Sequence, residues 1–207
     1  MTSEFFEFDE NKMEPWIMDT NAASSTEHHE AGSDVGWTEP LRGPIELTLM
    51  DEGDVWPDIM GCGADIKGLY VSERVKRIFD EERIDYGRCL STKIIGELPP
   101  ALVNVPPPNY YWMALHVGAQ RDMIRSGFTM TKKSPKVGIV YGGDPHRMVF
   151  VDGTWDGSPL FSITREPRWK FCTRRIIDLA SKHKWTNFKF VPIEHIYDEP
   201  PHPGVPY

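Results

Sequence analysis

The chain has 207 residues and a mass of 23.7 kDa, the size of one ordinary domain or of two small lobes. Hydrophobic residues make up 40%, charged residues 26% and aromatic residues 12%, which is typical of a folded chain and excludes wholesale disorder, collagen and coiled coils. The net charge of −8 disfavours non-specific nucleic-acid binding, because it repels phosphates, and favours a basic partner.

The N-terminus and the cysteines indicate the compartment. No apolar stretch reaches the roughly 20 residues that a membrane helix needs, and residues 1–10 carry acidic instead of basic side chains, unlike a secretory signal. Cys62, Cys89 and Cys172 lie far apart and form no CxxC pair, so neither a disulfide framework nor a zinc ribbon is predicted. We therefore expect a cytoplasmic protein that spans no membrane.

The first third of the chain predicts two short strands separated by a loop. Aromatic residues at 5–8 predict a strand, whereas residues 20–34 lose all periodicity and predict a flexible loop. His28 and His29 in this loop lack a third convergent ligand, so no metal site is predicted there. Residues 45–49 alternate apolar and polar side chains, which predicts a half-buried strand.

Residues 69–79 predict a strand, a helix cap and a helix. The apolar run from Leu69 ends at Ser72, a residue type that caps helix N-termini, and Val75, Ile78 and Phe79 then follow with helical spacing. An apolar stripe of this width is what a helix needs to lie on a sheet. The stripe is therefore predicted to belong to the core.

A second copy of this pattern occurs 101 residues later. Within residues 171–180, Thr173 takes the place of Ser72 and Arg175 takes the place of Arg74. A strand is predicted after each helix, at 89–95 and at 188–193. The sequence thus predicts two similar strand-helix-strand elements, which is compatible with an internal duplication.

The remaining elements are predicted from apolar runs and turn residues. Residues 99–108 form a proline-rich connection, 110–117 a buried strand, 136–141 and 146–151 a hairpin around 142–145, and 160–164 a further strand. Lys132, Lys133 and Lys136 are predicted to lie in a turn. Residues 197–207 are rich in proline and predict an extended tail.

The common catalytic motifs are absent from the sequence, which contains no GxSxG, GxxxxGK[ST], HExxH or CxxC pattern. An imidazole with a carboxylate is available in principle: His116 lies in an apolar run, and His146 lies near Asp144 and Asp152. A small hydrolase or transferase that uses His116 or His146 with a nearby carboxylate is therefore the alternative to a binding protein.

Seven short segments occur in an order typical of one family. They are Phe5–Phe8, Trp56-Pro57-Asp58-Ile59, Val71-Ser72-Glu73-Arg74, Tyr110-Tyr111-Trp112, Leu160-Phe161-Ser162-Ile163, Cys172-Thr173-Arg174-Arg175 and Phe188–Pro192. In these motifs the chain resembles the immunity proteins of bacterial polymorphic toxin systems that carry two Ser-Glu-Arg helix motifs, a group related to the double-CxxCG proteins of myxobacteria. The resemblance covers most of residues 1–196.

The resemblance implies a protein that binds and blocks a cognate toxin, with no catalytic residue and no cofactor. The motif residues are Asp58, Ser72, Glu73, Arg74, Thr173 and Arg175. We interpret them as structural, with contact between an arginine and the partner as the alternative. Both CxxCG motifs are missing, so no zinc is carried over, and the second helix motif reads Thr-Arg-Arg without the glutamate.

Together these observations predict an α+β fold, mainly of antiparallel strands, with two similar strand-helix-strand elements. We expect a single domain over residues 1–196, in which 1–105 and 106–196 could form two lobes. The predicted function is a non-enzymatic immunity protein whose partner is a toxin domain of basic character. Seven tryptophans and seven tyrosines fit this function, because aromatic residues often anchor interfaces.

Overall fold

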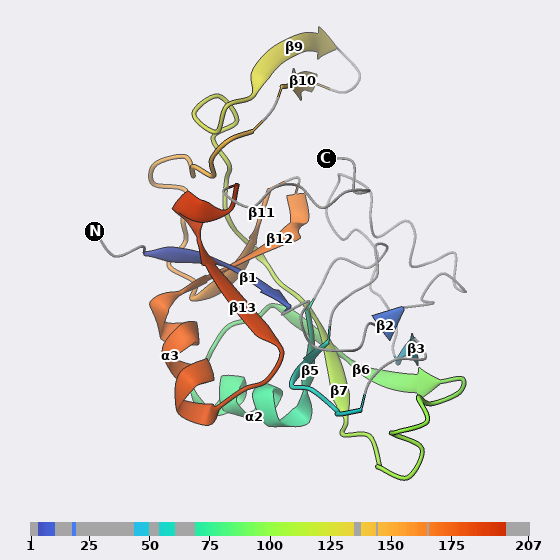
Figure 1. Cartoon of the computed structure of the whole chain (residues 1–207). Helices are drawn as coiled ribbons and strands as arrows, with labels where there is room; N and C mark the ends of the chain where they lie inside the picture. Colours follow the sequence, from blue (N-terminus) through green and yellow to red (C-terminus); the bar gives the residue numbers. More distant parts are fainter. Residues whose placement is uncertain are drawn as a thin grey trace.

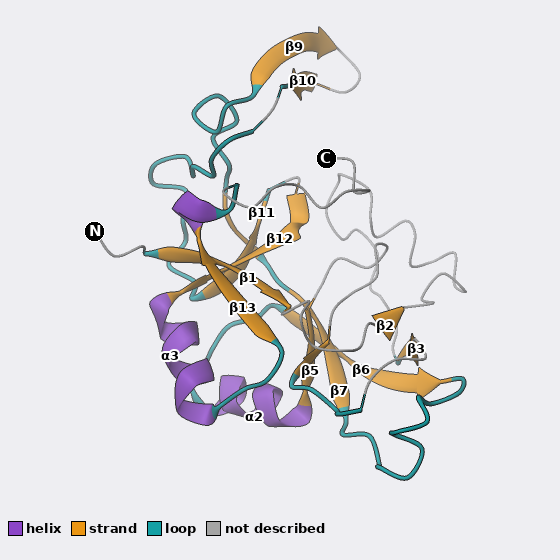
Figure 2. Cartoon of the chain, viewed as in Figure 1, coloured by secondary structure: helices purple, strands orange, loops and turns teal. Residues whose placement is uncertain are grey.

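The computed structural model describes residues 4–10, 18–19, 44–49, 54–60, 69–134, 138–143, 145–164 and 166–197. These residues form two large sheets, a separate hairpin and two α-helices (Figures 1 and 2). The elements in chain order are β1 (Phe5–Glu10), β2 (Met18–Asp19), β3 (Ile45–Leu49), β4 (Ile59–Met60), β5 (Leu69–Ser72), α2 (Glu73–Glu81), β6 (Arg88–Ile95), β7 (Tyr110–Ala114), β8 (Val117–Ala119), β9 (Thr129–Ser134), β10 (Gly138–Gly142), β11 (Leu160–Ile163), β12 (Glu166–Thr173), α3 (Arg174–His183), β13 (Phe188–Pro192) and the 3-10 helix η3 (Ile193–His195). The predicted α+β class is confirmed.

The two sheets mix antiparallel and parallel pairs. One has the strand order β2-β3-β6-β7-β5-β4, and the other has the order β13-β1-β12-β11-β8. Among the described strands, β3 pairs with β6 and β8 pairs with β11 in parallel, and the remaining pairs are antiparallel. The hairpin of β9 and β10 forms its own two-stranded sheet.

The predicted strand-helix-strand elements are both present. Strand β5 ends at Ser72, the N-cap of α2, and strand β12 ends at Thr173, the N-cap of α3. The apolar stripe of α2 is buried as predicted, at Val75, Ile78 and Phe79. In α3 the corresponding buried positions are Ile176, Leu179 and Ala180.

Each element is completed by a middle strand that pairs antiparallel with both of its strands. Strand β7 lies between β5 and β6, and β1 lies between β12 and β13. Tyr110 lies opposite Ser72 and Phe5 opposite Thr173, so the two middle strands share one register at the helix caps. Farther along the same strands, Cys89 pairs with Met113 and Phe190 pairs with Phe8. The offset of 101 residues therefore relates the sheets as well as the helices, while an evolutionary duplication stays a prediction.

The middle strands correct the predicted lobes. Strand β1 belongs to the sheet of β12 and β13, whereas β7 belongs to the sheet of β5 and β6. A division into 1–105 and 106–196 would therefore cut both sheets. The largest apolar cluster joins the halves further, because it contains side chains of α2, α3 and both middle strands, among them Val75, Ile176, Phe8 and Met113. Figure 1 shows the two helices next to each other on one side of the molecule.

Two predicted strands have different bounds in the structure. The predicted strand 110–117 is divided into β7 and β8, which belong to different sheets. The hairpin is formed by 129–134 and 138–142, not by the predicted strands 136–141 and 146–151. Lys132 and Lys133 therefore lie in β9 and not in a turn. Strand β10 ends before Gly143, where φ is +113° and the backbone leaves the extended conformation. This conformation is readily adopted only by glycine.

Several predictions fall outside the described residues: the loop at 20–34 with His28 and His29, Cys62, Asp144, and the tail from 198 to 207. Tyr197, predicted as the first residue of the tail, instead lies beside Trp169, with ring centroids 6.1 Å apart. Both described helices are too short to cross a membrane, and they are polar on one face.

Candidate functional site

The Asp58 carboxylate joins the first helix motif to the second half of the chain. Asp58 precedes β4 and is buried, with only 6% of its surface exposed. Its Oδ1 accepts hydrogen bonds from Ser72 Oγ at 2.8 Å and from Arg74 Nε at 3.0 Å. Its Oδ2 accepts from the backbone N–H of Thr186 at 3.0 Å and forms an ion pair with Arg74. A buried carboxylate is stable in this setting because each oxygen has charged or polar donors.

Ser72 and Arg74 each have a second contact besides Asp58. Ser72 Oγ accepts from the backbone N–H of Val75 at 3.4 Å, which makes it the cap of α2 as predicted. Arg74 Nη1 donates to the carbonyl oxygen of His183 at 3.2 Å, at the end of α3. The hydrogen bond to Asp58 raises the pKa of Arg74, which outweighs the opposing effect of burial. These contacts support the structural interpretation of both residues.

Glu73, Thr173 and Arg175 lie apart from the Asp58 carboxylate. Glu73 Oε2 accepts from Asn109 Nδ2 at 3.0 Å, which connects the first turn of α2 to the start of β7. Thr173 is the N-cap of α3 but makes no capping hydrogen bond through its side chain. Arg175 is exposed and donates to the carbonyl oxygen of Glu82 at 2.6 Å. The position equivalent to Asp58 is Pro159, so the second motif lacks a buried carboxylate.

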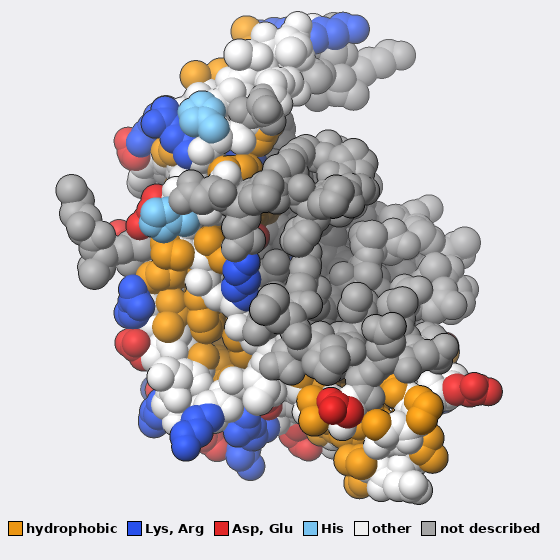
Figure 3. Space-filling model, in the orientation of Figure 1, with side chains coloured by type: hydrophobic (Ala, Val, Ile, Leu, Met, Phe, Trp, Pro, Cys, Tyr) orange, Lys and Arg blue, Asp and Glu red, His pale blue; other side chains and the backbone are white. Residues whose placement is uncertain are grey.

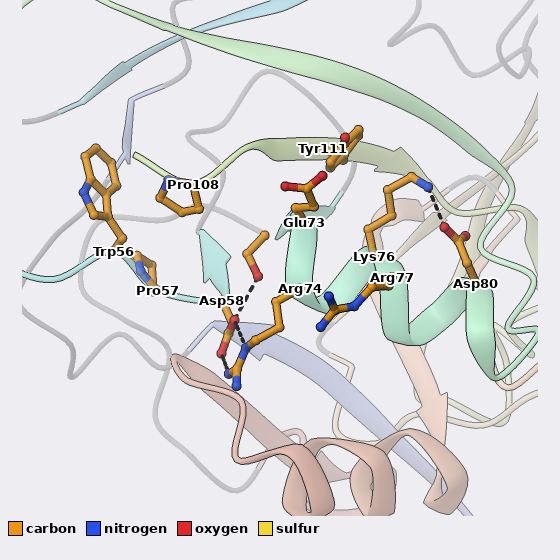
Figure 4. Close-up of a pocket in the computed structure, with 11 residues that line it drawn as sticks. Trp56, Pro57, Asp58, Glu73, Arg74, Lys76, Arg77, Asp80, Pro108 and Tyr111 are labelled. Carbon is orange, nitrogen blue, oxygen red and sulfur yellow. Dashed lines mark hydrogen bonds and ion pairs between the residues drawn. The ribbon is translucent and has the colours of Figure 1, made fainter. Parts of the chain in front are cut away.

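The first motif forms one wall of a surface pocket of about 680 Å³ (Figure 4). Trp56, Pro57, Pro108 and Tyr111 supply its apolar lining, from the segment before β4 and from β7 and the loop that precedes it. The polar lining consists of Asp58, Ser72, Glu73, Arg74, Lys76, Arg77 and Asp80. Figure 4 shows Trp56 and Tyr111 on opposite sides of the Glu73 and Arg74 positions.

Several charges in the pocket are held by neighbouring side chains. Lys76 Nζ lies 2.7 Å from Asp80 Oδ2 and 5.3 Å from the centre of the Tyr111 ring. The hydrogen bond to Asp80 raises the pKa of Lys76. Burial alone would raise the pKa of Asp80, but hydrogen bonds from Lys76 and Tyr86 outweigh it, so that the pKa is lowered. Arg77 is the most loosely held of the basic side chains in the pocket, 3.7 Å from Glu81 and 68% exposed.

An exposed apolar loop borders the pocket. Trp56 Nε1 donates to the carbonyl oxygen of Val105 at 3.0 Å, which fixes the loop before β7 against the pocket wall. Val55, Val103 and Val105 are 49%, 60% and 44% exposed. In Figure 3 hydrophobic side chains are visible at the end of the molecule where the β6–β7 loop lies. We call Val55, Trp56, Val103 and Val105 the valine rim.

The candidate catalytic histidines lie in different places, and neither lines this pocket. His116, between β7 and β8, has Nδ1 3.8 Å from Asp85 Oδ1 and Nε2 3.5 Å from Asp156 Oδ2. His146 is exposed, and its backbone N–H donates to Ser126. Asp152, predicted as a carboxylate partner, instead pairs with Arg125 at 3.1 Å. The structure thus gives His116 two carboxylate neighbours that the sequence did not identify.

The cysteines in the described part of the chain are unpaired. Cys172 is buried and Cys89 is half-buried. Burial raises the pKa of both thiols, and the effect is larger for Cys172. A raised pKa lowers the fraction of reactive thiolate.

Three features were not predicted from the sequence: the contact of Thr186 with Asp58, the exposed valines of the rim, and, outside the pocket, Asp85 and Asp156 as the carboxylates beside His116. Thr186 is 128 residues from Asp58, and no local pattern relates the two. Val103 and Val105 lie between Pro100 and Pro106, in a segment that the sequence predicts only as a connection. The one sequence feature related to the Thr186 contact is the offset of 101 residues, because it predicts two similar helices. When these helices pack antiparallel, the turn at 184–186 after α3 lies beside the first motif.

No family model matches the chain, and no curated protein matches it with significant similarity.

Proposed function

We propose that the chain is a non-enzymatic immunity protein that works in the bacterial cytoplasm by binding and blocking a toxin domain. The α2 pocket and the valine rim would form the centre of the contact. The observation that carries this proposal is the combination of Trp56 and Tyr111 in an open pocket with exposed valines at its edge. The order of motifs that resembles toxin immunity proteins supports the same function.

The composition of this surface is that of an interface centre. Protein interfaces concentrate binding energy in a few aromatic and arginine side chains that lie in pockets and are surrounded by apolar contacts. Trp56, Tyr111 and Arg77 provide such side chains, and the valine rim provides the apolar surroundings. A partner side chain that enters the pocket would be enclosed between the aromatic walls and α2.

The polar groups of the pocket favour recognition over chemistry. Asp58 is occupied by Ser72, Arg74 and Thr186, and Lys76 is paired with Asp80. A general base must be able to accept a proton from a substrate, and a carboxylate that already accepts several hydrogen bonds is poorly suited to that task. Such groups instead keep the pocket walls in place.

The net charge of −8 supports a basic partner. Opposite net charges raise the rate of association, and apolar contacts then determine how long the complex lasts. A nuclease toxin, with a basic surface for phosphates, would meet these requirements.

Co-expression with the toxin candidate of the neighbouring reading frame tests the proposal. We expect the protein to relieve growth inhibition and to co-purify with the toxin at equal stoichiometry. The variants Trp56→Ala and Val103→Glu should weaken the complex by about tenfold or more, because they remove an anchor or place a charge in the interface. Titration calorimetry with the purified pair would measure the change in Kd.

Val117→Glu is the matched control, because Val117 is also an exposed valine, at 55%, but lies in β8 outside the pocket. It should leave the Kd unchanged. Equal weakening by Val103→Glu and Val117→Glu would place the interface elsewhere, and full toxicity in the presence of the folded wild-type protein would refute the immunity function.

A second candidate, a hydrolase or transferase, is favoured by the position of His116 between Asp85 and Asp156. A carboxylate can orient an imidazole for proton transfer. Screening of ester and phosphoester model substrates with wild type and His116→Gln tests it. Turnover that depends on His116 would favour this candidate, whereas equal activity of the two proteins would eliminate it.

A further inference from the structure

We propose that the β9–β10 hairpin is an arm by which one copy of this chain docks on the acidic body of a second copy. The arm comprises residues 129–134 and 138–142. In Figure 1 it extends from the end of the molecule opposite to the helices. It pairs with neither of the large sheets.

The two chain segments that flank the arm are hydrogen-bonded to each other. Val149 N–H donates to Ser126 Oγ at 3.1 Å, and its carbonyl accepts from Asp122 N–H at 2.8 Å. Thr129 Oγ1 donates to the carbonyl oxygen of Gly142 at 3.1 Å, where the two strands of the arm begin and end. These contacts hold the two ends of the arm together, whereas the strands beyond them would gain order on docking.

The arm contains apolar side chains outside the core. Met130 is 59% exposed and lies opposite Tyr141 in the register of the hairpin. The arm residues whose side chains are described, 129–133 and 141–142, belong to none of the three apolar clusters. A two-stranded hairpin without a sheet or helix beneath it is only marginally stable. Docking would bury Met130 and stabilise the hairpin.

Charge identifies the occupant. Residues 121–151 contain six Lys and Arg against two Asp and Glu, a net charge of +4, and since the whole chain carries −8, the remainder carries −12. Lys132 and Lys133 on the arm are exposed, and Figure 3 shows Lys and Arg side chains at the far end of the arm and near its base. Outside residues 121–151, the described residues alone hold 19 Asp and Glu against 13 Lys and Arg, a net charge of −6, so the described part of the body carries charge opposite to that of the arm. The negative body disfavours a nucleic acid, which would be repelled along most of its length.

Two arms would be used in one closed dimer. Every copy has one basic arm and one acidic body, so a two-fold axis lets each arm contact the other body. The contact buries both arms, while the negative charge of the two bodies keeps the affinity moderate.

Sedimentation equilibrium tests this inference between about 1 µM and about 500 µM, a range that covers Kd values typical of weak dimers. We expect the mass to rise from 23.7 kDa toward twice that value. The double variant Lys132→Glu/Lys133→Glu should raise the dimer Kd by about tenfold or more, because it removes the complementary charge. Circular dichroism establishes that the variant is folded, which is expected since both lysines are exposed.

The double variant Lys93→Glu/Lys182→Glu is the control, because it makes the same change of charge at two exposed positions of the body. It should leave the dimer intact. Wild type that stays monomeric over the whole range overturns the inference, as does a dimer that both double variants weaken equally or that neither weakens. Binding of a fluorescent single-stranded DNA that requires Lys132 and Lys133, without dimer formation, would assign the arm to nucleic acid and also overturn it.

Discussion

Arg74 and Arg175 occupy the same position in α2 and α3, and each donates to a carbonyl oxygen at the end of the other helix. Arg74 reaches His183 at 3.2 Å, and Arg175 reaches Glu82 at 2.6 Å. Both acceptors are again 101 residues apart. The helices are therefore antiparallel neighbours, and each N-terminal arginine satisfies carbonyl groups that have no partner within the other helix.

This relationship predicts unequal effects of two equivalent substitutions. Arg74→Ala should lower the free energy of unfolding by about 2 kcal/mol, because it also leaves the buried Asp58 carboxylate without its ion pair. Arg175→Ala should cost about 0.5 kcal/mol, since it removes one exposed contact with a helix end. Urea denaturation measures both. Equal losses would contradict the asymmetry.

Asp58→Asn should also be destabilising, by about 2 kcal/mol, because the amide cannot accept all the hydrogen bonds that Ser72, Arg74 and Thr186 donate to the carboxylate. In the Asp58→Asn background, Arg74→Ala should have little further effect, as expected for two residues of one network. Asp178→Asn, at an exposed position of α3, is the control. Full additivity of the Asp58 and Arg74 substitutions would show that the network is not cooperative.

Gly87→Ala should destabilise the protein far more than Gly157→Ala. Both glycines have positive φ, +81° and +88°, but a Cβ at Gly87 would lie 2.4 Å from the carbonyl oxygen of Ala114, whereas nothing lies within 4 Å of one at Gly157. We expect a loss of about 3 kcal/mol or more at Gly87, and about 1 kcal/mol at Gly157 for the backbone conformation alone. Thermal denaturation of the two variants compares them, and similar Tm values would argue against the close approach.

Cys172 should stay unlabelled in the folded protein. Its thiol is buried, and burial raises its pKa, so both access and thiolate fraction are low. Cys89, which is half-buried, should react with iodoacetamide at an intermediate rate. Peptide mass spectrometry after timed labelling measures both, with labelling in urea as the reference. Labelling of folded Cys172 as fast as Cys89 would contradict its burial.

Asp80 should contribute a small stability that depends on pH. Its pKa is lowered in the folded chain, so the contribution is present above the unfolded value of about 4 and is lost as the pH falls through the folded value. Asp80→Asn should cost about 0.5 kcal/mol at neutral pH, because the pair with Lys76 is partly exposed and screened. Urea denaturation at a series of pH values should show the two proteins converging at acidic pH; a constant difference would rule out the ion pair as its cause.

The strand-helix-strand elements could be predicted because their signals are local. The cap at Ser72 and the spacing of Val75, Ile78 and Phe79 occur within eight consecutive residues, and the second copy repeats them. The Asp58 carboxylate could not be predicted as a network, since Thr186 lies 128 residues away and only the pairing of the two helices brings it there. The pocket is similar in this respect, because its walls come from three separate segments.

The bounds of the β9–β10 hairpin were not predicted correctly, for a different reason. Lys132 and Lys133 are predicted to lie in a turn, whereas the structure places them in β9. In a hairpin with two solvent-facing sides, lysine is as suitable as any strand residue, so charge did not distinguish strand from turn. The alternation of threonine with Met130 and Lys132 is the better indicator of a strand, because threonine favours extended backbone.

The place of β1 determines the order in which this protein can fold during its synthesis. Strands β5, β6 and β7 with α2 lie within residues 69–114, so this group can assemble as soon as the ribosome has released it. Strand β1 is synthesised well before its partners β12 and β13, which come from residues 166–192, so it stays unpaired until they have been made. Such long-range pairing slows folding, and until it occurs Phe6 and Phe8 remain exposed to other nascent chains.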